Sequence, residues 1–97
     1  MENKLPCRNE QNCIFRKIDE DMIIFSEEGQ WLHQLNDIGA DIWNLCDGTL
    51  NIEQIIGRIC DEYDIDFKNA LIDVSEFLKK MSDKNLIIYK EEILSKT

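Results

Sequence analysis

The sequence has little of what membrane-spanning or secreted proteins require. Its longest uninterrupted apolar runs are residues 22–25 and 86–89, and each falls far short of the roughly 20 residues that a membrane helix needs. The first six residues lack a basic segment followed by an apolar stretch, so they do not predict secretion. We therefore expect a cytoplasmic protein without a membrane partner.

Residues that carry enzyme chemistry are also scarce. His33 is the single histidine, and the four glycines form no phosphate-binding loop. The four cysteines, at positions 7, 13, 46 and 60, form no CxxC pair and have no zinc-like spacing. We expect structural thiols, no metal, no cofactor and no catalytic residues. The sequence therefore predicts a protein that is not an enzyme.

The charge is predominantly of one sign. Eleven Lys and Arg against 20 Asp and Glu give a net charge of −9 on 97 residues. Such a chain repels phosphate backbones, so nucleic acid is not an expected partner. The apolar share of 43% and the single proline are typical of one packed domain rather than a disordered chain.

The first half of the chain predicts strands. Runs of β-branched and aromatic residues over 13–18, 22–25 and 30–35 are separated by acidic or glycine-containing turns, which predicts a three-stranded antiparallel meander. Its third strand is then an edge with one row of unpaired backbone groups. Residues 1–12 are polar and show no periodicity, so they predict a flexible arm.

The second half predicts three helices. Asn36, Asn51 and Asp66 stand as N-caps before periodic apolar residues, and Gln54 can complete a capping box with Asn51. The third helix carries an apolar stripe, predicted to be buried, of Phe67, Ala70, Leu71, Val74, Phe77, Leu78 and Met81. Residues 86–89 are then predicted to form a short extended segment. Strands followed by helices predict an α+β fold of winged-helix type, with a domain over 13–90 and a tail over 91–97.

Two features go beyond what a packed core requires. The edge strand offers backbone groups to which a guest peptide can add a strand. On the third helix, Ile72 lies off the apolar stripe, with Lys68, Ser75 and Lys79 around it. An exposed isoleucine between lysines is also common on ordinary surfaces, so both readings stay open. Together the features predict a peptide groove whose guest has an apolar anchor flanked by Asp or Glu.

The stretch from Gln30 to Gly48 resembles the core of the PqqD family, LN-x-x-(G/A)-x-x-(I/L)(W/L)-x-L-x-(D/E)G. The resemblance spans roughly residues 13–89. Asn85 replaces the usual glycine before the last strand, and it also tolerates a left-handed turn. Residues 26–29 replace a proline-containing stretch usual in members of the quinone pathway, which argues against that pathway.

The resemblance implies a RiPP recognition element, a small chaperone that binds the leader of a ribosomally made precursor peptide. The leader adds to the third strand and lies beside the third helix, and the core is presented to a radical-SAM enzyme or a lasso-type leader peptidase. The implied binding residues in this sequence are Trp31, Leu32, His33, Gln34, Leu35, Lys68, Leu71, Ile72, Ser75 and Lys79.

A winged-helix DNA-binding regulator is the alternative, because it shares the predicted architecture. Its third helix would enter the major groove. In this chain that helix carries Asp73 and Glu76 as well as lysines, on a molecule of charge −9. This charge disfavours DNA and favours the peptide-binding interpretation.

Overall fold

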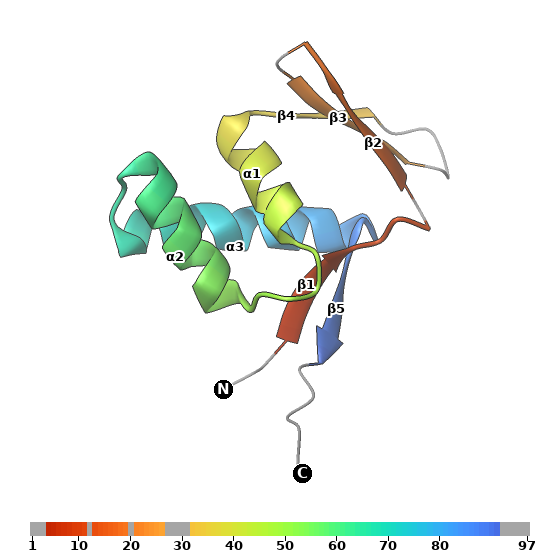
Figure 1. The fold of residues 1–97 in the computed structure, drawn as a ribbon. Helices are drawn as coiled ribbons and strands as arrows, with labels where there is room; N and C mark the ends of the chain where they lie inside the picture. The colour runs from red at the N-terminus through yellow and green to blue at the C-terminus, as the bar shows by residue number, and fades with distance from the viewer. Residues whose placement is uncertain (1–3, 12, 20, 27–31, 92–97) are drawn as a thin grey trace.

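The computed structural model describes residues 4–11, 13–19, 21–26 and 32–91 (Figure 1). The elements follow the order β1 (Lys4–Arg8), β2 (Cys13–Ile18), β3 (Asp21–Ser26), β4 (Leu32–Leu35), α1 (Asp37–Leu45), α2 (Ile52–Tyr63), α3 (Phe67–Asp83) and β5 (Ile87–Glu91). The fold is α+β and winged-helix-like, as predicted. Within the described ranges no helix is long and apolar enough to cross a membrane.

The main sheet is the predicted antiparallel meander, in the order β2-β3-β4. Ile24 in the middle strand pairs with Phe15 on one side and His33 on the other. Alternation along the strands points Met22 and Ile24 to the helices, where both are buried. The sheet packs on α1 by this face (Figure 1).

The predicted helix caps are confirmed. The Asn36 side chain accepts a hydrogen bond of 2.7 Å from the Gly39 backbone N–H. Asn51 and Gln54 form the reciprocal capping box, and Asp66 caps α3 by accepting from the Asn69 N–H. Asn85 follows α3 with φ of 62°, the left-handed conformation that asparagine tolerates. Local side-chain chemistry therefore sets where these helices begin.

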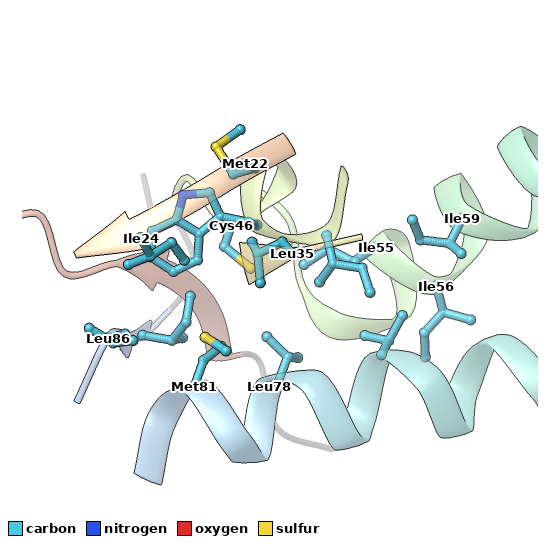
Figure 2. Close-up of a cluster of buried hydrophobic side chains, with 14 of the residues drawn as sticks. Met22, Ile24, Leu35, Cys46, Ile55, Ile56, Ile59, Leu78, Met81 and Leu86 are labelled. Atoms are coloured by element: carbon cyan, nitrogen blue, oxygen red, sulfur yellow. The ribbon is translucent and has the colours of Figure 1, made fainter. Parts of the chain in front are cut away.

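The core lies between the sheet and the helices. Figure 2 shows side chains from the sheet, among them Ile24 and Leu35, on one side of it and Leu78 and Met81 of α3 on the other. Trp43 of α1 is completely buried, and the Phe15 ring meets it edge-on with ring centroids 5.5 Å apart. Cys46 is also fully buried, and burial raises the pKa of its thiol to about 12.

The N-terminal arm predicted for residues 1–12 is wrong for its described part. β1 pairs antiparallel with β5, from Lys4 opposite Glu91 to Arg8 opposite Ile87. The Arg8 guanidinium donates to the carbonyls of Trp43 and Asn44, each at 3.0 Å, and so satisfies the C-terminal end of α1. Glu91 thus lies in a strand rather than in the predicted tail, and residues 92–97 lie outside the described residues.

The predicted stripe of α3 is correct in the middle of the helix and wrong at its start. Ala70, Val74, Leu78 and Met81 are buried, whereas Phe67 is 52% exposed and Leu71 is 41% exposed. Phe77 is half-buried. α2 packs against α3, and Phe67 and Leu71 stay exposed beside that contact.

Candidate functional site

β4 is a free edge of the main sheet. It bonds to β3 on one side, from Leu35 opposite Met22 to Leu32 opposite Phe25. Among the described residues no strand pairs with its other side. In an edge strand every second residue directs its N–H and C=O groups outward. The outer side of β4 can therefore form a further antiparallel or parallel ladder.

The end of β4 meets α1 and α3. Leu35 is buried, and Asn36 starts α1 directly after it. A Cβ atom placed on Gly39 would lie 3.6 Å from the Leu35 Cβ and 3.4 Å from a ring carbon of Phe77. Phe77 of α3 thus approaches the last residue of the edge strand across the first turn of α1. The tighter contact of such a Cβ would be with the Asn36 carboxamide oxygen, at 3.1 Å.

A surface pocket of about 290 Å³ opens at this junction. Ile38 and Ile42 of α1 and Phe77 of α3 form its apolar wall. Asp73, Glu76 and Lys80 of α3 supply its charged groups. An apolar side chain fits the wall, and a charged neighbour meets two carboxylates and one ammonium. We call this the β4 pocket.

Helical geometry divides the outside of α3 into two flanks. At about 100° per residue, positions 73, 76, 77 and 80 lie on one side of the buried Val74 line. These residues line the β4 pocket and form the pocket flank. The other side carries Lys68, Leu71, Ile72, Ser75 and Lys79, all exposed, and we call it the open flank.

The binding residues predicted from the sequence are therefore only partly brought together. Trp31 lies outside the described residues. Leu32, His33, Gln34 and Leu35 make up β4, so the strand part of the prediction forms one edge. The five predicted helix residues form the open flank, which turns away from the β4 pocket. Their role in peptide binding stays a prediction.

Sequence reasoning missed the pocket flank. It assigned Phe77 to the core, and it treated Asp73 and Glu76 as exposed acidic side chains. One signal could have identified them. Gly39 and Phe77 are the places where the first and third helices can approach closely, because glycine has no side chain. Even so, no pattern in the sequence indicates which flank of the third helix faces the third strand of the sheet.

A further hydrogen bond holds α1 against α2 away from the β4 pocket. The Tyr63 hydroxyl donates to the Asp41 carboxylate at 2.5 Å. This bond raises the pKa of Tyr63 above its ordinary value, and burial and the charge of Asp41 add to the shift. Over the described residues, no three His, Cys, Asp or Glu side chains are grouped to hold a metal.

The comparisons with known proteins agree with the fold. A family described as Coenzyme PQQ synthesis protein D (PqqD) matches residues 21–87, more than half of the chain. A solved structure titled "TbiB1 in Complex with the TbiA(beta) Leader Peptide" has a TM-score of 0.74 and 23% identity, covering 84% of this chain and 93% of that chain. At that identity the likeness shows the fold. None of the curated proteins matches the chain.

Proposed function

Since the chain belongs to the PqqD family, we propose that it binds the leader segment of a ribosomally made precursor peptide and catalyses no reaction itself. The structure with a similar fold is a complex with a leader peptide. The observation that carries the proposal is the free edge of β4, whose last residue, Leu35, is followed directly by Asn36 in the lining of the β4 pocket. Backbone pairing along the edge supplies affinity, and the pocket selects a side chain.

The lining of the β4 pocket favours particular side chains in the leader. Ile38, Ile42 and Phe77 accept an aliphatic or aromatic anchor. Asp73 and Glu76 outnumber Lys80 at the rim, and the whole molecule is negative. A leader with Lys or Arg beside its anchor is therefore favoured. This proposal reverses the acidic leader expected from the lysines of the open flank.

DNA is the less favourable ligand for the same surface. In the winged-helix alternative α3 would lie against phosphates, but its pocket flank carries Asp73 and Glu76. Two carboxylates on a molecule of charge −9 oppose that contact. Titration of labelled duplex DNA and of labelled leader into the protein separates the two, because we expect binding of the leader alone.

We further propose that the bound precursor is presented to a separate enzyme, a radical-SAM enzyme or a lasso-type leader peptidase. Strand addition fixes the register of the leader on β4, so the core emerges at a fixed place. Modification of the precursor by such an enzyme should then be faster when this protein is present. Omission of the leader from the precursor should remove that gain.

A pair of proline variants on β4 tests the strand addition. Neighbouring residues of a strand point their N–H groups to opposite sides, so one of His33 and Gln34 faces the free edge. Proline there removes only a donor to the guest strand. We expect that variant to keep its circular dichroism spectrum and to lose at least about tenfold in leader affinity by calorimetry.

The other variant of the pair is the control. Its proline removes a bond between β3 and β4, so it should lower the urea midpoint of unfolding. The probe is a synthetic leader peptide that the wild-type protein binds. If both variants fold and bind this leader as the wild type does, the leader does not add to β4.

A further inference from the structure

The outer face of the main sheet, which turns away from the helices, is more apolar than a solvated face requires. Side chains alternate between the two faces of a strand, so Ile14, Ile18, Ile23 and Phe25 stand on the face opposite to the buried Ile24. The first two are 52% and 47% exposed, Phe25 is 39% exposed, and Ile23 is half-buried. Antiparallel sheets with one solvated face commonly place polar residues there. Contact with solvent therefore does not account for these side chains.

The strand register joins these residues into one patch. Residues directly opposite each other on neighbouring strands share a face, and their side chains are neighbours. The β2–β3 register pairs Ile14 with Phe25, Arg16 with Ile23 and Ile18 with Asp21. Figure 1 shows α1 on one side of this sheet and no described helix or strand on the other. We call these six residues the outer patch.

The outer patch differs in charge from the rest of the molecule. The chain has 20 Asp and Glu residues, but β2, β3 and β4 contain only one of them, Asp21. Arg16 balances Asp21, so the patch is neutral on a molecule of charge −9. Two copies that approach through carboxylate-rich surfaces repel each other. Through the outer patch they can meet without that repulsion.

The two charged groups of the patch are arranged for a partner of the same kind. Arg16 and Asp21 are exposed diagonal neighbours, and within the described part of the chain they form no ion pair with each other. A two-fold axis between two facing sheets, along the line from Ile18 to Ile23, exchanges the positions of the two charges. Arg16 of each copy then faces Asp21 of the other, as a self-complementary interface requires.

We propose that the outer patch docks the same patch of a second copy of this chain, so that two main sheets pack face to face in a two-fold dimer. Ile18 and Ile23 of both copies lie at its centre, and two ion pairs between Arg16 and Asp21 flank them. Strands of at most six residues span about 20 Å, so the interface is small and the dimer is weak and reversible.

This dimer goes beyond the proposed function and does not depend on it. The outer patch lies on a face of the sheet, whereas the leader is proposed to add to the edge of β4. Face-to-face packing leaves that edge unpaired, so each copy of the dimer can still bind a leader.

Sedimentation velocity of the full-length protein at rising concentration tests the proposal. We expect a reversible equilibrium between monomer and dimer in the micromolar to millimolar range. Ile18→Glu places a charge at the centre of the interface and should raise the dissociation constant of the dimer at least about tenfold. Arg16→Asp should do the same, because the new carboxylate faces Asp21 of the other copy. Asp21→Arg should also do so, because it sets two arginines opposite each other.

A mixture of the two charge variants separates contact between copies from contact within one chain. When the Arg16→Asp protein is mixed with the Asp21→Arg protein, both pairs across the interface again join an arginine and an aspartate. The mixed dimer should therefore form with a dissociation constant within about threefold of the wild-type value. An ion pair within one chain cannot be restored by mixing.

A matched control lies on another strand. Ile88→Glu changes an exposed isoleucine of β5, 40% exposed, outside the outer patch. It should change the dissociation constant less than about twofold. The substituted residues Arg16, Ile18, Asp21 and Ile88 are all exposed, so circular dichroism should be unchanged in each variant.

Three outcomes overturn the proposal. A wild-type protein that is monomeric at every concentration does so. A dimer that Ile18→Glu and the charge variants leave unchanged uses another face of the molecule. A mixture of the charge variants that stays monomeric would show that Arg16 and Asp21 do not meet across the interface. Leader binding at β4 is measured separately with the proline variants, so these outcomes leave the proposed function standing.

Discussion

The two flanks of α3 differ in what packs against them and in the sign of their charge, although each has apolar side chains at its centre. The pocket flank carries Asp73, Glu76 and Lys80 around Phe77, and the start of α1 lies across it. The open flank carries Lys68 and Lys79 around Leu71 and Ile72, and solvent covers it. Each flank thus combines apolar and charged side chains. Tertiary packing alone decides which of them joins the edge strand.

Truncation of one apolar residue on each flank should give the largest difference. A fully buried phenylalanine changed to alanine loses about 3–5 kcal/mol. Because Phe77 is half-buried against Gly39, Phe77→Ala should lower the free energy of unfolding by about 2–3 kcal/mol. Ile72→Ala, at an exposed position, should cost under about 0.5 kcal/mol. Urea titration followed by circular dichroism measures both.

Phe77→Ala should also reduce leader affinity more than Ile72→Ala does. Phe77→Ala removes part of the apolar wall of the β4 pocket. It should therefore weaken leader binding under conditions where the variant remains folded. Ile72→Ala should leave leader affinity unchanged. Equal losses of stability would show that Ile72 packs as Phe77 does. A leader that loses affinity only with Ile72→Ala would restore the open flank as its site, as the sequence predicts.

Reversal of charge on each flank should have an intermediate effect. Asp73→Lys with Glu76→Lys removes the carboxylates at the β4 pocket, so a leader with a basic residue beside its anchor should bind about tenfold more weakly at low salt. Lys68→Glu with Lys79→Glu lies on the other flank and should change affinity less than about threefold. Calorimetry at two salt concentrations measures both. The opposite ranking would mean that the leader is acidic.

Most helices and strands of this fold can be predicted from the sequence because local chemistry determines where they begin and end. The three N-caps, the capping box and the alternation in β2 and β3 each involve residues within a few positions of one another. The β1–β5 pairing joins Lys4 to Glu91 across nearly the whole chain. No local pattern specifies such a partner, and a proline in β1 argues against a strand.

The candidate site likewise has one part that local sequence patterns predict and one part that depends on tertiary packing. The edge at β4 follows from three strands in a meander, which hairpin turns determine. The flank of α3 that reaches it depends on the crossing of α1 over α3, and therefore on the contact between Gly39 and Phe77. Periodicity identifies the buried line of Val74 but treats its two sides alike. For this reason the sequence predicts the edge strand and leaves the helix flank beside it undetermined.

The smallest predicted effect compares two glycines, one beside each flank. Gly57→Ala should raise the free energy of unfolding by about 0.5–1 kcal/mol, because alanine is the better helix former and its Cβ meets nothing within 4 Å. At Gly39 a Cβ would lie 3.1 Å from the Asn36 carboxamide oxygen and 3.4 Å from Phe77. The Asn36 carboxamide, which caps α1, must then shift, which offsets the gain from propensity.

We therefore expect Gly39→Ala to be neutral or destabilising while Gly57→Ala is stabilising, a difference of about 1 kcal/mol in urea titrations. The leader should bind Gly57→Ala as it binds the wild type and should bind Gly39→Ala more weakly, because the added methyl group narrows the β4 pocket that Gly39 lines. Equal stabilisation by both alanines would mean that α1 and α3 are not in contact at Gly39. The β4 pocket would then lack its closing wall, and the distinction between the two flanks of α3 would fail.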